Sequence, residues 1–296
     1  MKLFMNNTAT ILTAPAKVNL YLKIVGKRED GYHELDTLFL PFPALADTLA
    51  ITEKAEGCTI HCDDFDLPAE DNLIYKAWDK YAKATGFRPG LHIELTKRTP
   101  TGAGLGGGSS DAATMLRFLN SHPQSPGMAH DELNKLATGL GADVPFFLLD
   151  GPAWAKGIGE VLTPCEVDLS GLTALLVCPD VHVNTAWAYK AWSTVVRTEN
   201  LQKKDSFYLT TSHCSNNKAS SKTRVTLFND FEQVVLPEFS VIRETKEYLL
   251  KSGACGAVMS GSGASIISFF RTKNLAEQVS SELKAHNVDS VIHTFY

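Results

Sequence analysis

The chain has 296 residues, of which 44% are hydrophobic and 21% are charged, and its formal net charge is −5. This length allows one or two domains with a sizeable core, and the mild acidity argues against nucleic acid or an anionic membrane as the main partner. The sequence has no signal-peptide core at its start and no run near the ~18 apolar residues of a membrane span, so we expect a cytoplasmic protein.

Hydrophobic periodicity predicts the elements of the first half of the chain. They are strands over residues 10–25 with a turn at Gly26, a helix over 71–84, and a half-buried strand over 91–97. A glycine-rich loop follows that strand directly. A helix is expected beyond the loop, because apolar residues recur there at helical spacing, at Ala112, Met115, Leu116 and Leu119.

A further helix is predicted from near Asp131 to Gly141, where the glycine ends it. The apolar run over residues 146–149 is interpreted as the next strand. Pro145 is expected to hold Val144 extended. Asp143 would then lie on a loop just beyond a helix C-terminus.

The last part of the chain has a different order of elements, beyond a domain boundary that we place at residue 168. The predicted elements are a strand over 172–178, a helix over 239–251, strands over 257–259 and 265–270, a helix over 274–286 and a strand over 290–295. This order is typical of a split βαβ, ferredoxin-like domain. Residues 212–221, within a polar stretch over 197–224, are typical of a mobile surface loop. We therefore predict an α+β chain with domains over 1–168 and 169–296.

The segment Pro100–Ala113 is the strongest functional signal, because five glycines fall within seven residues of it. Bare backbone amides and the N-terminus of the following helix form a cradle for an anion, usually phosphate. Ser109, Ser110 and Asp111 suit the cap and first turn of that helix.

Three familiar phosphate loops fit this segment poorly. Gly102-x-Gly104-x-x-Gly107 matches the dinucleotide fingerprint, but no acidic residue ends a strand about 20 positions on. A Walker A loop needs a lysine where Ser109 follows the glycines. The later signatures of a protein kinase are absent from the sequence.

The full loop, from Pro100 to Ser109, resembles the phosphate loop of the GHMP kinases, with Thr101 where the family often has a bulky apolar residue. Two more motifs of that superfamily occur in order, Ala14–Leu22 and Met259–Ala264. Within the superfamily, three segments are similar to the 4-diphosphocytidyl-2-C-methyl-D-erythritol kinases: Lys17–Leu20, Arg28–Leu35 and Gly141–Phe146. The resemblance covers nearly the whole chain and weakens only across residues 190–235.

The resemblance implies a two-domain GHMP kinase fold with the active site in the cleft between the domains. It also implies transfer of phosphate from ATP, with Mg²⁺, to the 2-hydroxyl of 4-diphosphocytidyl-2-C-methyl-D-erythritol, a step in non-mevalonate isoprenoid precursor synthesis. Asp143 matches the catalytic aspartate, which takes the proton of the hydroxyl. Lys17 matches the catalytic lysine, a cation that would keep Asp143 ionised and offset charge on the transferred group.

The binding residues implied by the resemblance fall into three groups. Phosphate contacts are expected from Pro100, Thr101, Gly102, Ala103, Gly104, Leu105, Gly106, Gly107, Gly108, Ser109 and Ser110, and nucleoside contacts from Asn72 and Lys97. Substrate contacts are expected from Asn19, Tyr32, His33, Thr185 and Tyr189, with Tyr32 and His33 holding the cytosine ring. No carboxylate is assigned to Mg²⁺, for which the hydroxyl of Ser109 or Ser110 is the candidate.

Each candidate also has an ordinary structural explanation. Asp143 could be a helix-end residue with local hydrogen bonds, Lys17 a solvated surface lysine, and Asn19 a strand-end amide. Trp187 is expected in the core, and Ser260–Gly263 either beside the active-site cleft or in a plain hairpin turn. Three other functions stay open: a kinase of the same superfamily acting on homoserine or a mevalonate derivative, a non-catalytic sugar or nucleotide sensor, and a Rossmann oxidoreductase. We expect a monomer or a weak homodimer.

Overall fold

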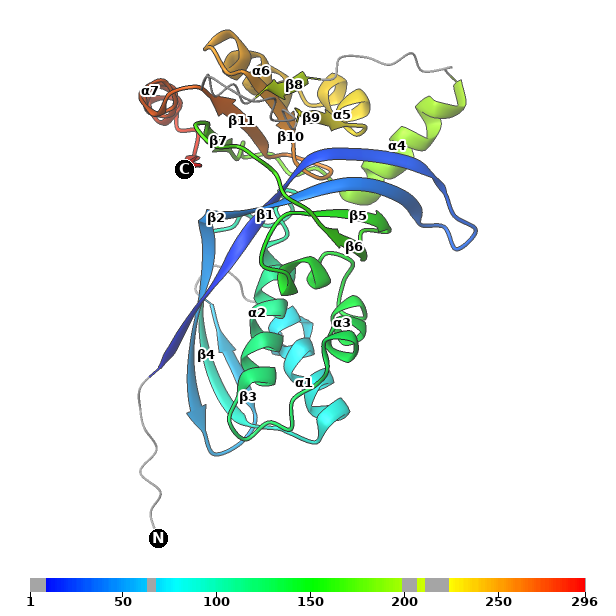
Figure 1. The fold of residues 1–296 in the computed structure, drawn as a ribbon, viewed down its shortest axis with the longest axis vertical. Helices are drawn as coiled ribbons and strands as arrows, with labels where there is room; N and C mark the ends of the chain where they lie inside the picture. Colours follow the sequence, from blue (N-terminus) through cyan, green and yellow to red (C-terminus); the bar gives the residue numbers. More distant parts are fainter. Residues whose placement is uncertain (1–8, 63–67, 199–206, 211–223, 296) are drawn as a thin grey trace, which may run out of the picture. The chain divides into compact units, whose positions relative to one another are not determined.

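The computed structural model describes residues 9–62, 68–198, 207–210 and 224–295. The chain divides into two compact units (Figure 1). Unit 1 comprises Met1–Lys17, Leu45–Thr101 and Gly106–Asp150, and unit 2 comprises Val18–Ala44, Gly102–Leu105 and Gly151–Tyr296. The domain boundary at residue 168 stays a prediction, and the predicted mobile loop, residues 212–221, lies outside the described residues.

Two long strands contribute residues to both units. β1 (Thr10–Lys27) confirms the strand predicted over 10–25, but it continues through Gly26. The turn follows at Arg28, whose amide donates to the carbonyl of Tyr32 at 2.7 Å. β2 (His33–Lys54) was not predicted as a strand.

Unit 1 is a small sheet with helices packed beside it. The far half of β2 pairs antiparallel with β4 (Gly90–Thr96), and β4 pairs parallel with β3 (Cys58–His61). The helices α1 (Leu73–Thr85), α2 (Gly107–Ser121) and α3 (His130–Thr138) gather beside these strands in Figure 1. The four apolar residues predicted to line one face of α2 are all fully buried, which confirms that helix and its orientation. The short 3-10 turn Ala69–Asp71 precedes α1.

Two local predictions in unit 1 are wrong. The run predicted as a strand forms instead a 3-10 helix, η2 (Val144–Leu148), with Pro145 in its first turn and Val144 in the helix rather than extended. Proline has the backbone angle that a first helical turn needs, and a four-residue apolar run has no period that separates strand from helix. The N-cap position of α2 is Gly106 and has no side-chain cap, so Ser109, Ser110 and Asp111 lie at the start of the helix as predicted, but none of them caps it.

Unit 2 contains the split βαβ arrangement predicted from the sequence. β7 (Thr173–Val177), β10 (Gly256–Met259), β11 (Ile266–Phe270) and β12 (Ser290–Thr294) form an antiparallel sheet in the order β10-β11-β7-β12. α6 (Ser240–Lys251) and α7 (Lys273–Ala285) are the two predicted helices. They pack against this sheet (Figure 1), and apolar residues from both helices and the strands form one buried core.

The other elements of unit 2 were not predicted. β5 (Ala153–Gly157) pairs with the near half of β2 and with β6 (Val161–Pro164). β9 (Arg224–Asn229) runs parallel to β1 and antiparallel to β8 (Phe207–Thr210). The helices are α4 (Thr185–Thr198) and α5 (Glu232–Glu238). Among the helices that the structure describes, none is both long enough and apolar enough to cross a membrane.

Candidate active site

The glycine loop between β4 and α2 has a backbone that other residues would rarely adopt. Gly102, Gly104 and Gly106 have φ angles of 70°, 77° and 69°. Left-handed residues that alternate with ordinary ones turn successive amides toward one side, which makes an anion-binding concavity. The loop leads directly into the first turn of α2, whose amides are the other part of such a site.

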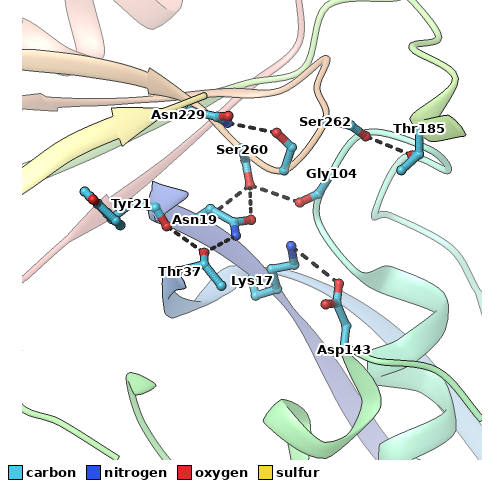
Figure 2. A network of polar contacts seen from close by, with 11 residues as sticks. Lys17, Asn19, Tyr21, Thr37, Gly104, Asp143, Thr185, Asn229, Ser260 and Ser262 are labelled. Carbon is cyan, nitrogen blue, oxygen red and sulfur yellow. Dashed lines mark hydrogen bonds and ion pairs between the residues drawn. The ribbon is translucent and has the colours of Figure 1, made fainter. Parts of the chain in front are cut away.

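Lys17 and Asp143, the two predicted catalytic residues, lie together in unit 1. The Nζ of Lys17 is 3.5 Å from Oδ2 of Asp143 (Figure 2). The Lys17 side chain is 5% exposed and that of Asp143 is 32% exposed. Lys17 is therefore not a solvated surface lysine. Asp143 occupies the N-cap position of η2 but makes no cap hydrogen bond, so local hydrogen bonding does not account for its position.

The start of α2 rests directly against Lys17, and glycine makes this approach possible. A Cβ atom on Gly106 would lie 3.3 Å from Cε of Lys17 and 3.0 Å from the ring of Phe147. On Gly107 it would lie 2.9 Å from the side chain of Thr99. Ser109 lies near Gly141, two residues before Asp143, since a Cβ on Gly141 would be 3.9 Å from Oγ of Ser109.

A buried charge cluster holds the segment before the loop. Nζ of Lys97 contacts the carboxylate of Asp47 and lies 2.8 Å from Oδ2 of Asp111. Oδ1 of Asp47 accepts hydrogen bonds from the amides of Arg98 and Thr99 at 2.6 and 2.7 Å. The cluster thus ties β2, the end of β4 and the first turn of α2 to one another, and the ammonium of Lys97 is engaged by two carboxylates.

Burial and the neighbouring charges shift the pKa values of Asp111 and Lys97. Burial raises the pKa of Asp111 to about 7, a rise that Lys97 opposes and Asp47 reinforces. Burial alone would lower the pKa of Lys97, but the carboxylates of Asp111 and Asp47 outweigh it and raise that pKa. One cation is shared by two buried carboxylates, so the full ionisation of both is unfavourable.

Several polar atoms around the first turn of α2 are buried without a hydrogen-bond partner among the described residues. They are Oγ1 of Thr99, Oγ of Ser110 and Oδ1 of Asp111. A buried unpaired polar atom costs roughly 1–3 kcal/mol. Buried polar atoms without a partner are often found where the protein uses the group for its function.

A second polar network lies in unit 2 around Asn19 and Ser260 (Figure 2). The backbone amide of Asn19 donates to Oγ of Ser260 at 3.1 Å, and that hydroxyl donates to the carbonyl of Gly104 at 3.0 Å. Nδ2 of Asn19 donates to Oγ1 of Thr37 at 2.8 Å. Asn19 is 2% exposed, so its side chain serves this internal network in the structure, and its predicted substrate contact stays a proposal.

The loop Ser260–Gly263 is more than a plain hairpin turn. Nδ2 of Asn229 donates to the carbonyls of Met259 and Gly261 at 2.6 and 2.8 Å. Oγ of Ser262 lies 2.8 Å from Oγ1 of Thr185. A Cβ on Gly104 would clash with the carbonyl of Ser260. The loop therefore braces the part of the glycine loop that belongs to unit 2.

Tyr32 and His33, predicted to hold cytosine, lie just before and at the start of β2, and the predicted substrate contact Tyr189 lies on α4. Tyr32 is 60% exposed, whereas His33 is buried and stacks on Tyr189 with ring centroids 4.6 Å apart. Burial, and next the charge of Lys27, lowers the pKa of His33. Trp187 packs against the core of unit 2, edge-on to Phe239.

Sequence reasoning missed several residues of these networks and gave Asn72 another role. Oδ1 of Asn72 accepts a hydrogen bond from the amide of Ile74 at 2.9 Å and caps α1, and its nucleoside contact stays a proposal. Asp47, Thr37 and Asn229 belong to none of the sequence motifs. Their partners are distant in sequence, so only the fold reveals them.

Two protein-family models match the chain. The GHMP kinases N terminal domain matches residues 72–151, and the GHMP kinases C terminal domain matches residues 216–289. The first match includes the glycine loop and Asp143, and the second includes the Ser260–Gly263 loop.

Related proteins resemble the chain over almost its whole length. The 4-diphosphocytidyl-2-C-methyl-D-erythritol kinase of Solidesulfovibrio magneticus is 43% identical over 270 residues, which cover 90% of each chain. That of Nitratidesulfovibrio vulgaris is 43% identical over 283 residues, covering 95% of this chain and 97% of the relative.

Solved structures agree with these relatives. A crystal structure of 4-(cytidine 5'-diphospho)-2C-methyl-D-erythritol kinase is 31% identical, covers 97% of this chain and 100% of its own, and superposes with a TM-score of 0.75. A homoserine kinase from Cytophaga hutchinsonii, 20% identical over 99% and 96% of the two chains with a TM-score of 0.63, shares the fold. The chain therefore belongs to the GHMP kinases and, within them, to the 4-diphosphocytidyl-2-C-methyl-D-erythritol kinase family.

Proposed function

We propose that the chain transfers the γ-phosphoryl group of ATP to the 2-hydroxyl of 4-diphosphocytidyl-2-C-methyl-D-erythritol, a step in non-mevalonate isoprenoid precursor synthesis. The ion pair of Lys17 and Asp143 beside the first turn of α2 carries this proposal. A protein that only bound a sugar or a nucleotide would need neither residue at the end of a phosphate loop. The named relatives supply the identity of the acceptor.

The reaction couples transfer of the phosphoryl group to the removal of one proton from the acceptor hydroxyl. The carboxylate of Asp143 accepts the proton of the 2-hydroxyl as its oxygen bonds to the γ-phosphorus. The bond from that phosphorus to the bridging oxygen breaks, and ADP leaves with the electron pair. Lys17 orients Asp143 and offsets the charge on the transferred group, while the backbone amides of the loop hold the phosphates.

Mg²⁺ is expected to arrive with the nucleotide. No group of three or more histidine, cysteine, aspartate or glutamate side chains suited to a metal occurs among the described residues, and Mg²⁺ on a nucleotide needs few protein ligands. The hydroxyl of Ser109 fits this role better than that of Ser110, because Ser109 is half-buried and Ser110 is fully buried. When bound, the ion offsets the negative charge of the phosphates.

The other binding residues are assigned from the resemblance to the family. The resemblance assigns Lys97 and Asn72 to binding of the nucleoside, and Asn19 and Thr185 to binding of the substrate. Tyr32, exposed at the start of β2, offers its ring to the cytosine. We place the reaction in the cytoplasm, which suits the free thiols of the described cysteines, and expect a monomer or a weak homodimer.

An ATP-dependent assay with mass detection of the phosphorylated product tests the proposal. Purified chain, ATP, Mg²⁺ and 4-diphosphocytidyl-2-C-methyl-D-erythritol should give a product heavier by one phosphoryl group. Asp143→Asn should lower kcat by about 100-fold to 10,000-fold, the usual contribution of a general base. ATP affinity, measured by calorimetry, should stay within about twofold, since the change leaves the loop amides in place.

Asp131→Asn is the matched control, because Asp131 is an exposed aspartate on α3. Its turnover should equal that of the unaltered chain. Near-normal turnover in Asp143→Asn would contradict the general-base role. Absence of product from the unaltered chain, with ATP still bound, would instead contradict the assigned acceptor.

A further inference from the structure

The hydroxyl of Ser193 lies between His33 and the backbone of its own helix. Ser193, on α4, donates a hydrogen bond to the carbonyl of Tyr189 at 2.9 Å. The same oxygen lies 2.9 Å from Nε2 of His33. No other residue that the structure describes makes a hydrogen bond to the His33 ring.

The position of the ring is set by packing on two sides. Tyr189 stacks on His33 with 19° between the ring planes, and Trp192 meets it edge-on at 6.0 Å and 87°. His33 is 8% exposed. The imidazole therefore presents an edge, rather than this stacked face, to any ligand.

The number of protons on these groups decides which ring nitrogen carries a hydrogen. A serine hydroxyl has one proton, and a carbonyl oxygen can only accept. The Ser193 proton is used on the carbonyl of Tyr189, so the Ser193 oxygen faces Nε2 with lone pairs. A hydrogen bond at this distance then requires a proton on Nε2. In the neutral ring, the other nitrogen, Nδ1, is left as an acceptor.

We propose that Ser193 is a positioning residue that fixes His33 in its Nε2–H form, so that Nδ1 selects a base bearing an amino group. Cytosine presents such a donor at N4, whereas uracil, like thymine, presents an acceptor oxygen at the same place. Ser193 thus acts through His33 to favour a cytidine substrate over its uridine counterpart. This inference rests on the proposed function, because it refines how the same substrate is recognised.

The environment of His33 supports the neutral form that this selection needs. Burial and the charge of Lys27 both lower the pKa of the ring. A doubly protonated ring would carry donors on both nitrogens and would favour uracil instead. The neutral state of the ring and its hydrogen bond with Ser193 therefore both leave Nδ1 as the hydrogen-bond acceptor.

Nitrogen NMR of the ligand-free protein tests the hydrogen position directly. In ¹⁵N-labelled protein at pH 7.5, His33 should show a pyrrole-like Nε2 and a pyridine-like Nδ1. The signals are assigned by their loss in His33→Gln. A protonated Nδ1 in the unaltered protein would overturn the proposal, whatever the enzyme phosphorylates.

Selectivity is measured as the ratio of kcat/KM for 4-diphosphocytidyl-2-C-methyl-D-erythritol to that for its uridine counterpart. Ser193→Ala should lower this ratio about tenfold, which corresponds to one modest hydrogen bond. The loss should lie in KM for the cytidine substrate, with kcat nearly unchanged. Ser193→Thr, which keeps the hydroxyl, should restore the ratio.

Ser281→Ala provides the matched control on α7, where an exposed serine makes the same bond to the carbonyl four residues earlier. It should leave the ratio unchanged. A Ser193→Ala variant with an unaltered ratio, in an enzyme that phosphorylates the cytidine substrate, would overturn the proposal. If the unaltered chain phosphorylates neither substrate, the proposed function fails while the NMR result still decides the role of Ser193.

Discussion

Asp111 shows how one buried carboxylate couples stability to pH. Its side chain is 4% exposed, one of its oxygens lacks a partner among the described residues, and it shares Lys97 with Asp47. Its pKa in the folded chain is about 7, above the ~3.9 of an aspartate in an unfolded chain. The folded state therefore holds a proton that the unfolded state has released between these pH values.

The sign of the stability effect follows from this difference. The contribution of Asp111 is fully present below about pH 4 and is lost as pH rises through about 7. Relative to Asp111→Asn, the unaltered chain should lose unfolding free energy between pH 4 and 7, by at most about 4 kcal/mol. Urea unfolding of both proteins at pH 5 and pH 8 measures the change.

Asp131→Asn serves as the reference for this measurement as well, since Asp131 is exposed and lies outside the cluster of Lys97, Asp47 and Asp111. Its unfolding free energy should follow that of the unaltered chain at both pH values. Parallel behaviour of Asp111→Asn and the unaltered chain would show that Asp111 is ionised throughout this range.

The glycine loop, as an element, depends on close backbone approach as well as on positive φ angles. Gly57 and Gly104 have nearly equal φ angles, 75° and 77°. A Cβ on Gly57 would meet nothing within 4 Å, whereas one on Gly104 would clash with the carbonyl of Ser260. A comparison of the two positions therefore separates the effect of backbone strain from that of the steric contact with Ser260.

Alanine at the two positions should therefore have different effects. Gly57→Ala should cost about 1–2 kcal/mol of stability from the left-handed conformation alone. Gly104→Ala should cost more and should also raise KM for ATP, because the loop must move away from Ser260. Urea unfolding and ATP titration check both effects. Equal losses in the two variants, with KM for ATP unchanged, would mean that the contact with Ser260 does not hold the loop.

Most elements were predictable where periodicity was long, and the exceptions have physical causes. β2 contains Pro41 and Pro43, which usually exclude a central strand. Its paired segments lie on either side of them: residues 35–39 pair with β5 and residues 48–54 pair with β4. Neither partner pairs with the prolines, and β2 is also hydrogen-bonded to β1, an arrangement that no local pattern reveals.

The site was predictable where it forms motifs and hidden where it depends on distant partners. Lys17 and Asp143 each belong to a sequence motif, and the fold brings them within 3.5 Å. Asp47 and Thr37 stand alone in the sequence and gain their partners only through sheet pairing and loop packing. Asp111 was predicted at the start of the helix, but its pairing with Lys97 was not.

At the scale of the whole molecule, the fold does not choose the acceptor. The homoserine kinase from Cytophaga hutchinsonii and a mevalonate kinase from Methanococcus jannaschii share this fold with TM-scores of 0.63, at 20% and 13% identity. One architecture thus serves several alcohols, and selection must come from local segments. For this chain we propose the Asp30–Leu35 turn and strand and the facing side of α4, where His33 stacks on Tyr189.

Homoserine and mevalonate should consequently be poor acceptors. Neither carries a base, so both would leave the polar edge of His33 without a partner, and a site built for a hydrogen bond rejects ligands that lack it. We expect kcat/KM for each to be at least about 100-fold below that for the cytidylylated substrate. ADP release at equal acceptor concentrations measures the three rates. If either alcohol reacts within tenfold of the cytidylylated substrate, recognition does not depend on the base, and the segments around His33 serve the fold rather than the choice of acceptor.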